Sequence, residues 1–140
     1  MHTTRENFAR QEDIDAILSM RRIAVVGLSS NPGRASNRVA RHLQREGYEV
    51  IPVNPNETEV LGSRAYAGLH DLPEPPEVVD VFRRSEYVAG VVDDAIAVGA
   101  KAIWLQLGVI DYDAALRARQ AGLIVVMDRC ISVELAVRGA

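Results

Sequence analysis

One short run of the 140 residues carries the side chains best suited to chemistry, and that chemistry is phosphate binding. An apolar segment, residues 23–28, is followed by a polar turn and then by a segment with helical spacing. Asn31 is a natural N-cap, and Pro32 suits the first helical position because its missing N–H would be unpaired there. The unpaired N–H groups and partial positive charge of a helix N-terminus attract phosphate. The side chains that could add donors or positive charge to such a site are Ser29, Ser30, Asn31, Arg34 and Arg38.

The patterns that this turn lacks narrow the choice of phosphate ligand. Gly27 is followed by Leu28 and Ser29, so the G-x-G-x-x-G fingerprint of NAD-binding turns is absent. Those folds also place an acid at the end of the second strand, where this sequence has Val53-Asn54-Pro55-Asn56. A Walker A loop does not fit either, because arginine stands where that loop needs lysine. NAD binding and ATP hydrolysis are therefore disfavoured, whereas an adenine nucleotide with an additional phosphate stays open.

Side chains for catalysis do not gather in the sequence. We find no nucleophile with a base and an orienting group, no paired carboxylates and no cluster at metal-ligand spacing. Cys130 opens the last predicted helix, where a thiol can be reactive, but a free cysteine is more often a small buried apolar residue. Asp80 lies inside an apolar strand, where an unpaired charge would be costly, so we expect an arginine partner from Asp128-Arg129. The sequence predicts a binding protein with no metal, not an enzyme.

Composition sets the class of protein. The chain is 48% hydrophobic and 25% charged with a net charge of −3, which is typical of one globular domain and argues against a nucleic-acid binder. The longest apolar runs have about six residues, far fewer than the roughly 20 of a membrane span. The first six residues contain no apolar stretch, and a lone cysteine allows no internal disulfide. We therefore expect a cytoplasmic protein without a membrane partner.

The elements that must position the phosphate-binding turn follow from the hydrophobic periodicity. Apolar runs alternate with segments of helical spacing, and this alternation predicts βαβ crossovers and a mostly parallel sheet. We expect one domain over residues 1–140, a doubly wound Rossmann-like α/β fold of five strands plus a short edge strand, ordered 3-2-1-4-5-6. An N-terminal helical segment in residues 1–20 should pack on its core. The predicted strands are residues 23–28, 48–53, 64–66, 77–82, 102–107 and 123–127, and Ser85 and Asp111 are expected to cap two of the helices.

In such a sheet a ligand lies outside the carboxyl ends of the strands, where the strand order reverses. That point falls between the first strand and the strand that ends at Phe82. The predicted surface therefore comprises residues 27–33, 53–56, 82–84 and 106–109.

Five motifs along the chain resemble those of the small bacterial and archaeal CoA-binding proteins, which are stand-alone relatives of the CoA-binding domain in succinyl-CoA synthetase α subunits. The resemblance covers residues 12–138 in order and spacing. The motifs that carry it are Val25-Val26-Gly27-Leu28-Ser29, Pro52-Val53-Asn54-Pro55, Val79-Asp80-Val81-Phe82-Arg83, Trp104-Leu105-Gln106-Leu107-Gly108 and Met127-Asp128-Arg129-Cys130.

The resemblance implies a domain that holds coenzyme A or an acyl-CoA. The pyrophosphate would lie over residues 27–34, the adenosine near residues 53–55, and the pantetheine arm past Phe82 and Arg83 toward residues 106–108. The residues predicted to bind the ligand are Gly27, Leu28, Ser29, Ser30, Asn31, Arg34, Asn37, Arg38, Val53, Asn54, Pro55, Phe82, Arg83, Gln106 and Gly108.

Two departures from the synthetases bear on function. A lysine follows the second-strand proline in those relatives, whereas Asn56 and Glu57 occur here, which puts recognition of the CoA 3′-phosphate at that position in doubt. The synthetases also phosphorylate a histidine in a later domain that this chain does not contain.

Three functions remain open from the sequence. The first is a CoA-binding module without chemistry of its own, with a protein partner or a homodimer as further partners. The second is the detached CoA-binding subunit of a split acyl-CoA synthetase, and the third, which the patterns favour least, is an NAD(P)-dependent oxidoreductase.

Overall fold

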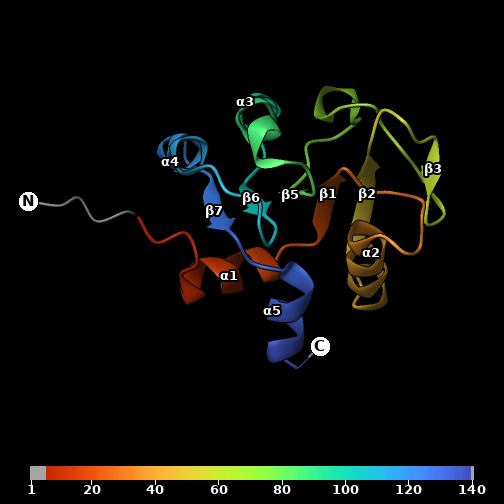
Figure 1. Cartoon of the computed structure of the whole chain (residues 1–140), viewed down its shortest axis with the longest axis horizontal. Coiled ribbons are helices and arrows are strands. Elements are labelled where there is room, and N and C mark those ends of the chain that lie inside the picture. The colour runs from red at the N-terminus through yellow and green to blue at the C-terminus, as the bar shows by residue number, and fades with distance from the viewer. Residues whose placement is uncertain (1–5, 140) are drawn as a thin grey trace, which may run out of the picture.

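Five parallel strands form the centre of the computed structural model, which describes residues 6–139 (Figure 1). The sheet strands are β1 (Arg22–Val26), β2 (Glu49–Val53), β5 (Val78–Val81), β6 (Ala102–Leu105) and β7 (Ile124–Met127). The helices are α1 (Gln11–Leu18), α2 (Ala35–Arg45), α3 (Val88–Ala97), α4 (Tyr112–Gln120) and α5 (Ile131–Val137), with short 3-10 turns η1 (Leu69–Asp71) and η2 (Ser85–Tyr87). A separate two-stranded hairpin joins β3 (Glu59–Val60) to β4 (Ser63–Arg64).

The strand order is β2-β1-β5-β6-β7, with every neighbouring pair parallel. The chain crosses from β2, at one edge, past β1 to β5, so the order reverses between β1 and β5. This confirms the predicted α/β fold and the position of its switch point, where open parallel sheets bind ligands.

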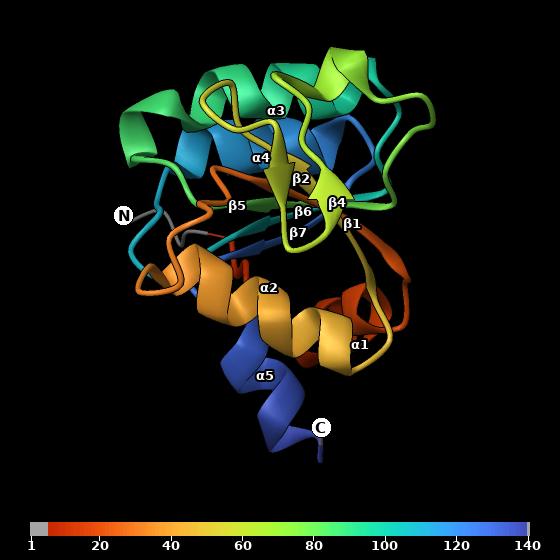
Figure 2. The same ribbon diagram turned by 90° about the vertical axis from the view of Figure 1, so that its right-hand side faces the viewer.

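Helices cover both faces of the sheet, as Figure 2 shows: α3 and α4 lie on one face, and α1, α2 and α5 on the other. Because successive strand residues point to opposite faces, each strand feeds two cores. Ala24 and Val79 join the core under α3 and α4. Val25 and Trp104 join the core under α1, α2 and α5, where Trp104 is fully buried. Strands buried on both faces explain the unbroken apolar runs of the sequence.

The predicted edge strand over residues 64–66 is largely wrong. Ser63 and Arg64 pair with the β3 segment, antiparallel and outside the main sheet. Only Tyr66 extends the sheet, through a parallel bridge to Val53 in which its N–H donates to the carbonyl of Pro52 at 3.0 Å. The hairpin turn redirects the chain after two residues of pairing, so one bridge is all that forms.

Two predicted helix starts also need correction. Asn31 does not cap α2, because its side chain instead accepts the N–H of Gly33 at 2.9 Å and closes a tight turn before the helix begins at Ala35. Ser85 opens the short turn η2 instead of capping α3, and its hydroxyl accepts the N–H of Ile110 at 2.9 Å. In both cases the side chain has a tertiary or local partner that competes with the capping role. The Asp111 cap is confirmed, since its carboxylate accepts the N–H of Ala114 at 3.0 Å.

Candidate functional site

The turn between β1 and α2 begins with a close approach of two strands. Gly27 has φ +88°, and a Cβ built there would lie 2.3 Å from the carbonyl oxygen of Phe82. Its N–H donates to Val53 at 2.8 Å, while the N–H of Phe82 donates to Val26 at 2.8 Å. Gly27 therefore joins the carboxyl ends of β1, β2 and β5 at the switch point, and only glycine fits there.

Buried polar side chains of α2 shape the rest of the turn. Ser36 accepts the N–H of Ser29 at 3.1 Å, and the amide of Asn37 donates to the carbonyl of Ser29 at 2.8 Å. Ser36 and Asn37 are almost fully buried, and Leu28 is fully buried. Ser30 and Asn31 remain on the exposed outer side of the turn. The predicted residues Leu28 and Asn37 are thus buried beneath the turn and stabilise it, whereas Ser30 and Asn31 are accessible to a ligand.

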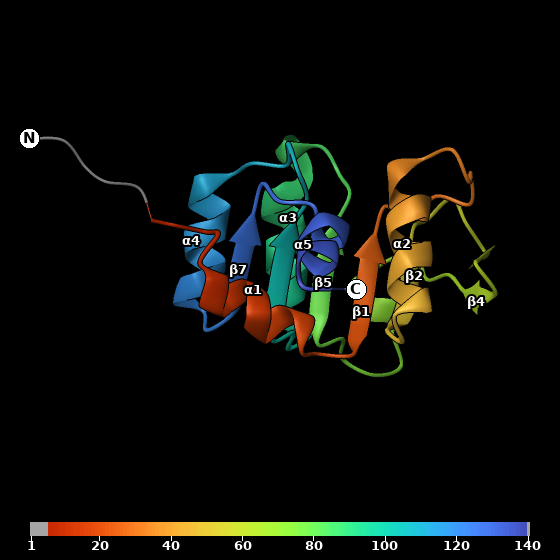
Figure 3. The ribbon, with the colours of Figure 1, turned by 90° about the horizontal axis from the view of Figure 1, so that it is seen from below.

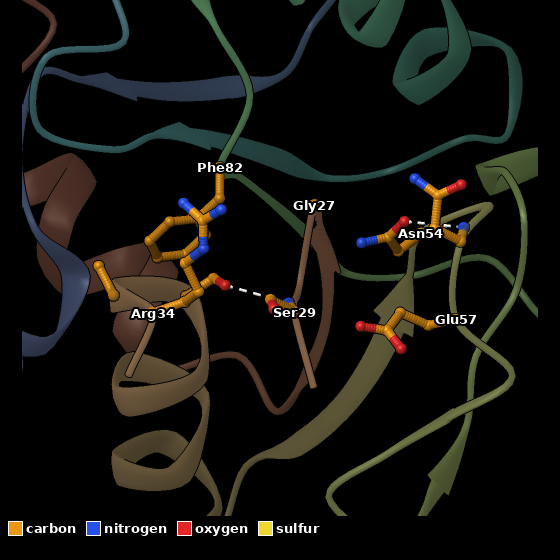
Figure 4. A pocket seen from close by; sticks show the side chains of 9 residues that line it. Gly27, Ser29, Arg34, Asn54, Glu57 and Phe82 are labelled. Atoms are coloured by element: carbon orange, nitrogen blue, oxygen red, sulfur yellow. Dashed lines mark hydrogen bonds between the residues drawn. The ribbon is translucent and has the colours of Figure 1, made fainter. Parts of the chain in front are cut away.

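A pocket of about 440 Å³ opens over this turn (Figure 4). Arg34 and Phe82 lie on one side of it, Asn54 and Glu57 on the other, and Gly27 and Ser29 between them. Its lining residues are Gly27, Ser29, Arg34, Ala35, Ser36, Asn54, Asn56, Glu57 and Phe82. The structure therefore brings together five of the predicted site residues, namely Gly27, Ser29, Arg34, Asn54 and Phe82.

The two charges of the pocket wall lie on opposite sides and do not pair with each other. Arg34 is exposed, and within residues 6–139 no acid lies at ion-pair distance from its guanidinium. Arg38, by contrast, donates to the carbonyl of Gly33 at 2.7 Å and faces the hollow between α2 and α5. Arg34 is thus the cation that this pocket can offer to an anionic ligand.

Three other predicted residues line a separate hollow of about 130 Å³ on the α3 side of the sheet. They are Val53, Pro55 and Arg83, next to Leu69 and Asp94. Arg83 stacks over the ring of Tyr87 at 4.5 Å, which orients its guanidinium along η2. These residues lie at the carboxyl ends of β2 and β5, on the other side of the same switch point.

The last two predicted residues follow β6. Gln106 is buried, and its side chain accepts the N–H of Ile131 at 3.2 Å at the start of α5. Gly108 donates its N–H to the carboxylate of Asp128 at 2.8 Å, and Asp128 itself adopts a left-handed conformation with φ +62°. Gln106 is therefore bonded to the start of α5 and Gly108 to the residue after β7, and both lie outside the pocket over the turn.

Comparison with known proteins identifies the family of this chain. A sequence model described as the CoA binding domain matches residues 21–136. The chain belongs to this CoA-binding domain family. It is 39% identical over 132 residues to the uncharacterized protein YneT of Bacillus subtilis, covering 94% of this chain and 98% of YneT. The family predicted from the five motifs is confirmed.

Two further similar proteins come from archaea. A hypothetical protein from Pyrococcus horikoshii has a solved structure with a TM-score of 0.89 and 38% identity, covering 98% of this chain and 97% of that one. The alpha subunit of an ADP-forming acetate–CoA ligase II of Pyrococcus furiosus is 28% identical over 91 residues, which is 64% of this chain and 20% of that subunit. The CoA-binding domain described here thus corresponds in sequence to one part of a larger ligase subunit.

Asp80 in this CoA-binding domain lacks the arginine partner that the sequence suggested. Its side chain is fully buried in β5, and neither carboxylate oxygen has a hydrogen-bond partner among the described residues. Arg129 is exposed and donates to the carbonyl of Asp128, while the Asp128 carboxylate is taken by Gly108. Burial alone raises the pKa of the Asp80 carboxyl well above its usual range, because no cation or hydrogen-bond donor among the described residues stabilises its charged form.

Sequence reasoning missed three residues of the pocket wall, namely Ala35, Ser36 and Glu57, whereas Asn56 belongs to the predicted surface of residues 53–56. Ser36 had a signal in the sequence, because a polar residue on the apolar face of a helix needs a partner. Glu57 also had a signal in the sequence, because an acid occurs there close to the position where the related synthetases have a lysine. Only the fold shows that its carboxylate accepts the N–H of Ser30 at 2.7 Å.

Groups outside the pocket make contacts between elements. His42 Nδ1 and the Ser132 hydroxyl form a hydrogen bond that joins α2 to α5, and His70 pairs with Asp94 at 3.1 Å. Cys130 is half-buried beside the hollow between α2 and α5. Among residues 6–139 no group of His, Cys, Asp or Glu side chains could hold a metal ion. None of the helices in that range is long and apolar enough to cross a membrane.

Proposed function

We propose that this domain binds coenzyme A, or an acyl-CoA, at the carboxyl ends of its parallel strands and carries out no chemistry of its own. The observation that supports this most directly is the pocket over the turn of residues 27–34, which the unpaired Arg34 and the first residues of α2, Ala35 and Ser36, line at the switch point. An anion there gains charge-assisted hydrogen bonds from Arg34 and the favourable field of the N-terminus of α2. The family match supports CoA as the source of that anion.

The residues present fit the ligand in three places. The pyrophosphate would lie over Gly27–Arg34, where the small side chains of Ser29 and Ser30 leave the backbone approachable. The adenosine would lie near Val53, Asn54 and Pro55. The pantetheine arm would pass Phe82 and Arg83 toward Gln106 and Gly108, and the exposed Leu107 beside them offers an apolar surface for an acyl group.

A second candidate function is the detached CoA-binding subunit of a split acyl-CoA synthetase. It is favoured by the match to one fifth of a ligase alpha subunit. This function requires a separate protein that carries the catalytic domain, and co-purification with such a protein would support it.

A thermal-shift panel tests the proposed function. A ligand present at 100 times its Kd stabilises the fold by about 2.7 kcal/mol, which raises Tm by a few degrees for a domain of this size. We expect CoA and acetyl-CoA to raise Tm, and NAD, NADP and ATP to leave it unchanged. A shift with NAD alone would support the oxidoreductase instead.

A pair of variants locates the site within the same assay. Arg34→Ala should weaken CoA binding about tenfold, because it removes a charge-assisted contact to phosphate. Arg45→Ala is the matched control, since Arg45 is an exposed arginine of the same helix about three turns away from the pocket. Equal losses in the two variants would mean that CoA does not bind over the turn.

A further inference from the structure

Glu57 is the acidic side chain on the wall of the CoA pocket, opposite Arg34 (Figure 4). Its carboxylate accepts the N–H of Ser30 at 2.7 Å. Ser30 belongs to the turn proposed to hold the pyrophosphate, so a carboxylate of the protein already occupies one anion-binding donor of that turn. No cation among the described residues neutralises Glu57 at ion-pair distance.

The backbone around Glu57 fixes the position of this acid. Asn54 accepts the N–H of Glu57 through its carbonyl at 3.2 Å and the N–H of Asn56 through its side chain at 2.9 Å. The side-chain amide of Asn54 in turn donates to the carbonyl of Leu28 at 3.1 Å. These bonds tie the segment after β2 to the turn after β1, and Glu57 lies between the two.

That position corresponds to the ribose in the proposed binding mode. With the adenosine near Val53–Pro55 and the phosphates over Gly27–Arg34, the ribose has to bridge the gap in which the Glu57 carboxylate lies. A carboxylate accepts hydrogen bonds from ribose hydroxyls, as the acid after the second strand does in dinucleotide-binding folds. A ribose phosphate at the same place would bring two like charges together.

We propose that Glu57 is a specificity-determining residue, which accepts a ribose hydroxyl and disfavours a ribose 3′-phosphate, so that dephospho-CoA binds at least as tightly as CoA. This inference rests on the proposed function and refines it, because it concerns only the nucleotide end of the ligand. The 3′-phosphate then contributes no affinity in this domain, and recognition depends on the pyrophosphate and the pantetheine arm.

Calorimetric titration with CoA and with dephospho-CoA tests the role of Glu57. For the unaltered chain, we expect the ratio Kd(CoA)/Kd(dephospho-CoA) to be one or larger. Glu57→Gln keeps an oxygen that can accept the Ser30 N–H but removes the charge, and we expect it to lower the ratio about fivefold. Glu59→Gln is the matched control, because Glu59 is an exposed acid two residues away with the same charge, and its ratio should not change.

The possible outcomes distinguish a failure of the role proposed for Glu57 from a failure of CoA binding itself. A chain that binds CoA about tenfold more tightly than dephospho-CoA, or an E57Q ratio equal to that of the unaltered chain, overturns the role of Glu57 and leaves CoA binding intact. Failure of the folded, unaltered chain to bind either compound refutes the proposed function itself. Both constants of a ratio come from the same preparation, so partial unfolding of a variant cancels. If E57Q does not fold, Glu57→Ala provides the same comparison.

Discussion

Gly27 carries two constraints at once, a left-handed backbone and a carbonyl oxygen 2.3 Å from where a Cβ would lie. Gly27→Ala should therefore lower the free energy of unfolding by about 2–4 kcal/mol, since either β1 or the end of β5 has to move. Gly62→Ala separates the two constraints, because Gly62 has φ +80° but nothing within 4 Å of the position that a Cβ would take. It should cost only about 1–2 kcal/mol. Chemical denaturation of both variants measures the difference, and equal losses would contradict the role given to the Phe82 carbonyl.

Asp80 makes stability depend on pH in the direction opposite to that of a salt-bridged acid. Burial raises the pKa of its carboxyl in the folded chain, whereas the unfolded chain releases this proton near pH 4. Above about pH 4 the unfolded state therefore binds fewer protons than the folded state, and stability falls as pH rises toward the folded-state pKa. Asp80→Asn removes this titration.

Denaturation of the two proteins between about pH 5 and pH 8 measures that effect. We expect the stability of Asp80→Asn relative to the unaltered chain to rise with pH over this range. A constant difference between the two proteins would show that Asp80 is ionised or paired in the folded state.

The loop after β6 is fastened by side chains from other elements. Asp128 accepts the N–H of Gly108, and Ser85 accepts the N–H of Ile110 at 2.9 Å. Asp128 also has the left-handed φ that aspartate and asparagine tolerate better than most residues. Asp128→Ala should cost about 1–2 kcal/mol and speed hydrogen exchange at the Gly108 amide, whereas Asp128→Asn should keep both near their original values. Hydrogen exchange at the Gly108 amide, measured by NMR in Asp128→Ala, tests whether Asp128 holds the loop through this hydrogen bond. An unchanged exchange rate would mean that Asp128 matters only for its left-handed backbone conformation.

Periodicity predicts whole elements well and side-chain partners poorly. The five long strands, their order and the switch point follow from apolar runs that are buried on both faces. The start of α2 does not follow from the apolar pattern, because the Asn31 side chain bonds to Gly33 instead of capping the helix. The expected pairing near Asp80 does not form either, because the Asp128 carboxylate accepts the N–H of Gly108. Glu57 reaches the pocket only because the segment after β2 folds back toward Ser30, which a pattern along the chain does not encode.

At the scale of the whole molecule, a net charge of −3 opposes the approach of an anionic ligand. In the proposed binding mode, affinity for CoA comes from Arg34 and the turn, at short range. Added salt screens such contacts, since the Debye length falls from about 10 Å at 0.1 M to about 3 Å at 1 M. We expect Kd for CoA to rise several-fold over this range, and to rise much less in Arg34→Ala. A Kd that is independent of salt would place the affinity in apolar contacts of the pantetheine arm.

The two edges of the sheet are both partly covered by chain from outside it. On one side Tyr66 bridges to Val53, and on the other the N–H of Met127 in β7 donates to the carbonyl of Phe8 at 2.8 Å. Phe8 is buried and stacked under Arg119 at 4.1 Å, which anchors this segment beside β7 (Figure 3). An open strand edge is a template for pairing with another chain and hence for aggregation. Each of these segments therefore protects a sheet edge from pairing with another chain. Release of the segment that contains Phe8 would expose the edge of β7 and favour aggregation while the core stays folded.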